Sequence, residues 1–133
     1  MKDEAMSQIT EKRLRIVEIV LLIAIGGFAG ASLRNLLALV IPGLGGTFAA
    51  NALGCLVLGF LSYEAELVGV LKEETGYVAS TGFLSSLTTY STFAVETVQA
   101  APIISIVNVV ANYGVGFAAV FVGRAAVKSI EAD

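Results

Sequence analysis

The chain has 133 residues, of which 56% are hydrophobic and 14% are charged, whereas ordinary soluble domains carry about 25% charged residues. This composition indicates a membrane protein and leaves little chain for a soluble domain. The net charge is −3 and the Lys and Arg residues are scattered among acids, so no nucleic-acid partner is expected. A single cysteine, Cys55, and the absence of histidine exclude a disulfide framework and disfavour transition-metal chemistry.

Cutting the sequence at its charged residues leaves four apolar windows, each long enough or nearly so for one membrane-crossing helix. The sequence therefore predicts an all-α membrane protein with four transmembrane helices. The expected spans are residues 16–41, 47–63, 77–99 and 102–127. They make up a single transmembrane domain at residues 16–128, between a polar N-terminal tail at 1–15 and a C-terminal tail at 129–133.

The first span contains small residues four apart, Gly26 and Gly30, which let another helix approach closely. Arg34 is the one cation inside the apolar body of the sequence. It is either a side chain that reaches toward the membrane surface or a positive anchor at the mouth of an ion pathway. The residues alone leave both alternatives open.

The second span carries an amide, Asn51, five residues from its start. An Asn within a span can bond a neighbouring helix, and its N–H₂ group can also donate to an anion. The connection that follows, residues 64–75, is rich in charge and is expected to be a solvated loop without a site.

The third span concentrates hydroxyl groups, since six of the eight residues from Ser85 to Thr92 are Ser or Thr. Bilayer hydrocarbon offers them no hydrogen bonds. They can bond back to their own helix and hold neighbouring helices, or they can line an ion or solute pathway through a broken helix. Their density, beside Tyr90 and Phe93, favours the pathway.

The fourth span begins at Pro102 and has one polar or small face. Ser105, Asn108, Asn112 and Gly116 repeat at the three- and four-residue spacing that places them on one side of a helix. We expect this face to meet the third span.

Three sequence stretches resemble motifs of the small four-helix fluoride channels called Fluc or CrcB. They are GGFAGASLRN (26–35), GTFAANALGCLVLGF (46–60) and TGFLSSLTTYSTFAVE (81–96), and NVVANYGVGFA (108–118) is a weaker match. The third motif is long and unusual in composition, which makes the resemblance specific. The resemblance covers most of the chain.

The resemblance implies a passive channel, not an enzyme, that exports cytoplasmic fluoride across the cell membrane and so relieves fluoride toxicity. It also implies an antiparallel dimer of two oppositely inserted subunits, with two pores along their interface and a structural sodium ion (Na⁺) where the third helices break. By position, the sodium ligands are the main-chain oxygens of Ser85 and Thr88. The residues that correspond to the family's pore and vestibule are Asn51, Tyr90, Ser91, Thr92, Phe93 and Arg34. Glu96 matches the third-helix carboxylate of the family.

The sequence departs from the family pattern at three places. Ser85 and Ser86 replace the usual Gly-Gly at the helix break, where a Cβ atom restricts the backbone. Tyr90 replaces the first pore Phe, and its hydroxyl adds bulk and a lone pair that repels fluoride. Gly116 stands where some members carry a hydroxyl residue.

Two other function classes stay open. A small four-helix multidrug or cation exporter needs a carboxylate well inside its first span, and residues 19–33 contain none. A non-conducting structural subunit of a heterodimeric fluoride channel is compatible with the substitution at Tyr90.

The distribution of cations predicts the orientation of the chain. If the loops alternate sides, seven cations share the side of both termini and Arg34 lies opposite. The seven are Lys2, Lys12, Arg13, Arg15, Lys72, Arg124 and Lys128. The excess of positive charge on the cytoplasmic side of membrane proteins then places both termini in the cytoplasm. Such a bias favours an oppositely biased paralogue over a second copy as the partner subunit.

Overall fold

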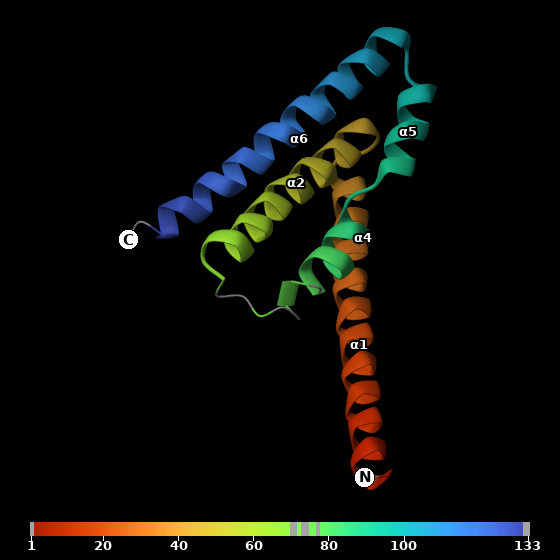
Figure 1. Cartoon of the computed structure of the whole chain (residues 1–133). Coiled ribbons are helices and arrows are strands. Elements are labelled where there is room, and N and C mark those ends of the chain that lie inside the picture. The colour runs from red at the N-terminus through yellow and green to blue at the C-terminus, as the bar shows by residue number, and fades with distance from the viewer. Residues whose placement is uncertain (1, 70–71, 73–74, 77, 132–133) are drawn as a thin grey trace.

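The computed structural model describes residues 2–69, 72, 75–76 and 78–131, and its regular elements in this part of the chain are all helical (Figure 1). Three long helices and three short ones follow one another. They are α1 (Lys2–Val40), α2 (Leu44–Leu67), the π-helix η1 (Val78–Leu84), α4 (Ser85–Leu87), α5 (Tyr90–Gln99) and α6 (Pro102–Glu131).

Three of these helices are long and apolar enough to cross a membrane, within the part of the chain that the structure describes. Their membrane-capable stretches are Met6–Val40, Leu44–Glu66 and Pro102–Ile130. The third expected span is built differently, because η1, α4 and α5 divide it into short pieces. The first residue expected for that span, 77, lies outside the described residues.

The first helix includes most of the segment expected to be a polar tail, since α1 begins at Lys2. Its 39 residues give a length of about 58 Å, roughly twice the thickness of a bilayer's hydrocarbon core. Figure 1 shows the N-terminal half of α1 extending well beyond the other helices. Met6, Ile9 and Leu14 are exposed there.

The connections also differ from the expected boundaries. The turn between α1 and α2 is short and contains Gly43, whose φ of +69° a residue with a Cβ atom rarely adopts.

At its C-terminal end α2 continues to Leu67, so Glu64 is helical and buried rather than part of a solvated loop. Part of that expected loop, at 70–71 and 73–74, lies outside the described residues. Likewise α6 continues to Glu131, through part of the expected C-terminal tail.

Close helix packing depends on glycine at two interfaces. On α1, a Cβ atom at Gly26 would lie 2.7 Å from the Val78 carbonyl oxygen of η1, and one at Gly30 would lie 3.0 Å from the Phe83 carbonyl carbon. The close approach predicted for this face of α1 is therefore confirmed. Helices α2 and α6 lie side by side (Figure 1), and Gly123 on α6 allows the same closeness there.

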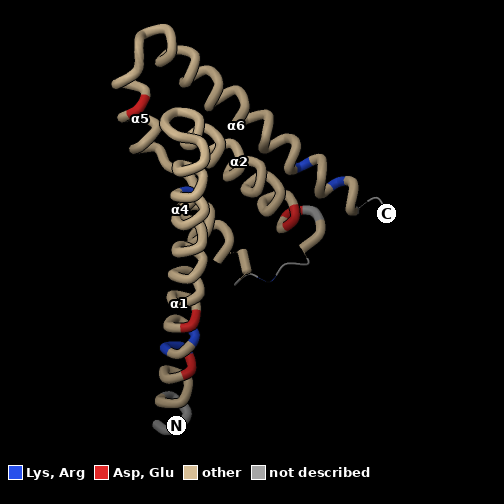
Figure 2. Tube along the Cα trace, turned by 180° about the vertical axis from the view of Figure 1, so that it is seen from behind, with Lys and Arg blue, Asp and Glu red and all other residues tan. Residues whose placement is uncertain are grey.

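The single chain buries few apolar side chains. A small cluster of Ala50, Leu84 and Leu87 forms its core. Large apolar side chains remain exposed along the long helices, including Phe117 and Phe121 on α6. Such a surface is typical of a protein that contacts lipid or another subunit. Charged residues gather near the N-terminus of α1 and near the C-terminal ends of α2 and α6, and the exceptions are Arg34 on α1 and Glu96 on α5 (Figure 2).

The break in the third segment lies at Thr88 and Thr89. Both residues have extended backbone angles, with φ/ψ of −78°/156° and −151°/122°. The resemblance had placed the break at Ser85 and Ser86, but these residues are helical in α4. Serine is compatible with that conformation, because its hydroxyl can bond back to a carbonyl one turn earlier, as the Ser85 hydroxyl does to Thr81.

Candidate functional site

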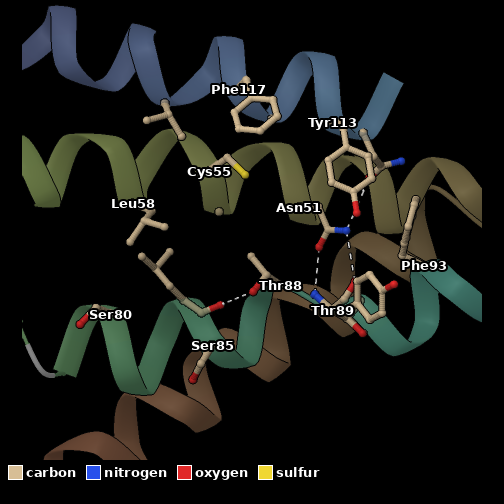
Figure 3. A pocket seen from close by; sticks show the side chains of 16 residues that line it. Asn51, Cys55, Leu58, Ser80, Ser85, Thr88, Thr89, Phe93, Tyr113 and Phe117 are labelled. Carbon is tan, nitrogen blue, oxygen red and sulfur yellow. Dashed lines mark hydrogen bonds between the residues drawn. The ribbon is translucent and has the colours of Figure 1, made fainter. Parts of the chain in front are cut away.

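The helix break is held by a side chain from another helix. The Thr89 amide donates a hydrogen bond to Asn51 Oδ1 at 2.9 Å, and Asn51 Nδ2 donates to the Thr89 carbonyl oxygen at 3.2 Å (Figure 3). An extended residue between two helices loses its helical partners. Asn51 supplies both a donor and an acceptor in their place.

The hydroxyl groups of this region fall into two sets. Those of Ser85 and Thr88 bond back to carbonyls of the preceding turn, at Thr81 and at Leu84. The structure therefore shows the local bonding that was one alternative for the Ser and Thr cluster.

The second set surrounds the start of α5. Thr89 is the N-cap of this helix, because its Oγ1 accepts a hydrogen bond from the Thr92 amide at 3.2 Å. The same Oγ1 donates to Thr92 Oγ1 at 3.0 Å and lies 3.4 Å from Ser91 Oγ. Both Ser91 and Thr92 are exposed.

Main-chain oxygens at the break lose the donors of a continuous helix. The Thr89 amide, which would bond the Ser85 carbonyl in an uninterrupted α-helix, bonds Asn51 instead. Carbonyl oxygens freed in this way are the hard ligands that an alkali cation prefers. Among the described residues, no group of three or more His, Cys, Asp and Glu side chains could hold a metal ion.

Three aromatic rings meet next to the break. Phe93 is buried, with 8% of its surface exposed, whereas Tyr90 is 74% exposed. Their ring centroids are 6.0 Å apart at an interplanar angle of 45°. Tyr113 of α6 meets Phe93 at 6.3 Å and 86°, an edge-to-face arrangement that aromatic rings favour.

A cavity of about 560 Å³ joins these features. Its walls come from α2, η1, α4, α5 and α6 and from the break (Figure 3). Five of the residues assigned from the sequence line it, namely Asn51, Ser85, Thr88, Tyr90 and Phe93. The structure thus brings the expected sodium ligands and most of the expected pore residues to one place.

A second cavity of about 270 Å³ lies between α1, the start of α2 and α5. Arg34, Thr92 and Glu96 line it, together with Asn35 and Thr47. Glu96 Oε2 is buried and, within the described residues, has no hydrogen-bond partner. Thr89 lines both cavities, so the residue at the break forms part of the wall between them.

Comparison with known proteins identifies the family. Residues 21–124 match the profile of the family described as CrcB-like protein, Camphor Resistance (CrcB). The chain belongs to the CrcB family. The resemblance seen in the sequence motifs is therefore confirmed.

Several CrcB relatives are named as channels. The chain is 53% identical over 112 residues to Fluoride-specific ion channel FluC 1 of Haloarcula marismortui, which covers 84% of this chain and 87% of the relative. It is 48% identical over 111 residues to Fluoride-specific ion channel FluC 1 of Natronomonas pharaonis, with coverage of 82% and 93%. It is also 48% identical over 113 residues to Fluoride-specific ion channel FluC 2 of Halobacterium salinarum, with coverage of 84% and 88%. These relatives are ion channels rather than enzymes.

Sequence reasoning did not assign a role to the α6 residues of this CrcB site. The polar face of α6 meets α5 as expected, since Ser105 Oγ donates to the Thr97 carbonyl at 2.6 Å and Asn108 Nδ2 to Thr97 Oγ1 at 2.7 Å. Asn112, on the same face, instead accepts a hydrogen bond from Asn51 of α2 at 3.5 Å. The four-residue spacing of Asn108 and Asn112 placed both on one face of the helix, but spacing alone does not show which neighbouring helix each side chain contacts.

Proposed function

We propose that this chain is a subunit of a fluoride-specific ion channel that passively exports cytoplasmic fluoride. Membership of the CrcB family and the three channel relatives support the proposal. The observation that carries it is the convergence of the Asn51 amide, the Thr89 hydroxyl and the Phe93 ring on one cavity at a helix break.

The residue types suit fluoride. This anion is small and strongly hydrated, so a selective pore must replace water with hydrogen-bond donors while it excludes larger halides. Hydroxyl and amide hydrogens supply such donors. The edge of an aromatic ring carries the positive end of its quadrupole, so Phe93 can offer its edge to an anion. Tyr90, Ser91 and Thr92 complete the proposed pore residues.

The second cavity is the proposed vestibule. Arg34 is half-buried and brings a positive charge to the wall that it shares with Thr92 and Glu96. Such a charge raises the local concentration of anions. This placement supports the role of pathway anchor for Arg34 over that of a side chain that only reaches the membrane surface.

The proposed assembly has four transmembrane crossings per subunit, with the segment from η1 to α5 as the fourth and broken crossing. A second subunit in the opposite orientation would cover exposed apolar side chains and close the cavity that Tyr90 lines. The excess of cations on one side of the chain supports a paralogue as that partner, with both termini of this chain in the cytoplasm.

The break also fits a structural sodium ion. The main-chain oxygens of Ser85 and Thr88 would hold it, because the Thr89 amide no longer bonds the Ser85 carbonyl. Bound there, the ion supplies a fixed positive charge beside the cavity. The residues of the chain itself hold the break, through the two bonds between Asn51 and Thr89.

Efflux from liposomes tests the function. The chain is reconstituted alone and together with an oppositely biased paralogue, and the release of fluoride and of chloride is measured with ion-selective electrodes. We expect release of fluoride and not of chloride. Equal rates for the two anions would refute a selective pore. Fluoride release that needs only the paralogue would identify a structural subunit, and proton-coupled dye efflux would identify the exporter class.

A further inference from the structure

A continuous series of hydrogen bonds links α2, α6 and α5 behind the site. Asn51 Nδ2 donates to Asn112 Oδ1 at 3.5 Å, and Asn112 Nδ2 donates to Asn108 Oδ1 at 2.9 Å. Asn108 Nδ2 donates to Thr97 Oγ1 at 2.7 Å, and Thr97 Oγ1 donates to the Phe93 carbonyl at 2.6 Å. The series therefore begins at the proposed pore amide and ends at the main chain of the proposed pore ring.

Main-chain groups at its two ends determine the direction of every bond. The Thr89 amide can only donate, so the atom of Asn51 that faces it must be Oδ1, and Nδ2 donates both to the Thr89 carbonyl and to Asn112 Oδ1 on α6. The Phe93 carbonyl can only accept, so the Thr97 hydroxyl donates to it and accepts from Asn108. Each side-chain amide between these ends then has one possible orientation.

Hydrogen bonds that all point the same way polarise one another, and a low-dielectric interior strengthens them. Asn108 is buried, with 8% of its surface exposed, so its amide belongs to such an interior. Its position within the series connects the Asn51 amide to Thr97 through Asn112, although Asn51 and Thr97 lie on different helices.

Two members of the series lie outside the linings of both cavities. Within the described residues, neither Thr97 nor Asn108 is among those that line the two cavities. Thr97 lies one turn after Phe93 on α5 and bonds its carbonyl. Any effect of Thr97 on an ion must therefore act through Phe93 or Asn51.

We infer that Asn108 and Thr97 are positioning residues of the proposed channel: they hold the Asn112 amide with its Oδ1 toward the N–H₂ group of Asn51, and they fix the turn of α5 that carries the Phe93 ring. The inference rests on the proposed function, because only an ion pathway makes the orientation of these two groups matter for flux. A purely structural role would instead affect the stability of the helix contacts and leave the selectivity unchanged.

The test replaces Thr97 by Val, which has a similar shape and no hydroxyl, and by Ser, which keeps the hydroxyl. We expect Thr97→Val to lower fluoride flux by about tenfold, the effect of one buried hydrogen bond, and to reduce the fluoride-over-chloride ratio. Thr97→Ser should restore both values. Ser105→Ala is the matched control, because it removes a hydroxyl bonded to the Thr97 carbonyl but outside the series.

A second measurement does not depend on conduction. With 4-fluorophenylalanine at position 93, the ¹⁹F NMR signal should be a single sharp line in the parent protein, in Thr97→Ser and in Ser105→Ala. It should shift or broaden in Thr97→Val. Thr97→Ala repeats both measurements should the valine variant fail to assemble.

The outcomes separate the two proposals. A parent protein without selective fluoride flux would overturn the proposed function, and the ¹⁹F signal would still decide whether Thr97 positions the ring. A Thr97→Val protein with the parent's flux, anion ratio and ¹⁹F line would overturn the inference and leave the channel function intact.

Discussion

Asn51 and Thr89 form a reciprocal pair across 38 residues of sequence: the Thr89 amide donates to Asn51 Oδ1 at 2.9 Å, and Asn51 Nδ2 donates to the Thr89 carbonyl at 3.2 Å. One side chain thereby satisfies both main-chain groups of a residue that is buried and extended between two helices. The helix break is thus stabilised by α2.

Replacing Asn51 by Leu should destabilise the protein. The buried main-chain groups of Thr89 would lose their partners, which costs about 1–3 kcal/mol for each group left unsatisfied. Thermal unfolding in detergent measures the change. Asn35→Leu is the matched control, because Asn35 is exposed on α1. Equal melting temperatures for the two variants would contradict a stabilising role for the pair.

Replacing Gly123 by Ala should disrupt the packing of α6 on α2. A Cβ atom at Gly123 would lie 2.6 Å from the Phe60 amide nitrogen, and overpacking of this kind costs about 1–3 kcal/mol. Gly114→Ala on the same helix is the control, because within the described residues no atom beyond its own stretch of α6 lies within 4 Å of the added Cβ. Size-exclusion profiles and melting temperatures should show that Gly123→Ala is less stable than Gly114→Ala. Equal stability of the two variants would show that α2 and α6 can move apart to accommodate the added Cβ atom.

Replacing Phe93 by Ile should lower fluoride flux by about tenfold, because an apolar wall remains but the aromatic edge is lost. The edge-to-face contact with Tyr113 would be lost as well. Liposome efflux measures the flux, and size exclusion checks the assembly. Flux at the parent's level would mean that Phe93 serves only as packing.

Replacing Tyr90 by Phe should leave fluoride flux equal or raise it. The ring is 74% exposed in the single chain, and removal of its hydroxyl removes an acceptor lone pair from the proposed path. The same efflux assay compares the variant with the parent. A large drop in flux would instead show that the hydroxyl takes part in conduction.

Cysteine labelling tests the orientation. In a Cys55→Ala background, single cysteines are placed at Ser7, in the N-terminal part of α1, and at Gly45, near the start of α2. Intact cells are treated with a membrane-impermeant thiol reagent. The bias of seven cations against one predicts labelling at 45 and protection at 7. Equal labelling at both positions would show dual insertion and remove the basis for a paralogous partner.

The sequence by itself determined the class of the protein and the apolar part of its three long helices, although α1, α2 and α6 extend beyond the predicted ends. Uncharged windows the length of a bilayer can satisfy their main-chain groups only within themselves, so composition and spacing suffice to predict them. The small residues Gly26 and Gly30 indicated a close helix contact for a similar reason, since the absence of a Cβ atom is a local property. The motif from Thr81 to Glu96 identified the family.

Only the tertiary structure decided where the third segment breaks and which helix each polar group meets. The break lies at Thr88 and Thr89, not at Ser85 and Ser86, because Asn51 on a distant helix supplies the partners that an extended Thr89 needs. Any Ser or Thr in the cluster was compatible with a local bond to its own helix. The hydrogen bonds between Asn51 and Thr89 decide which of these residues forms the break. Because the two residues are 38 positions apart, no local sequence pattern predicts that position.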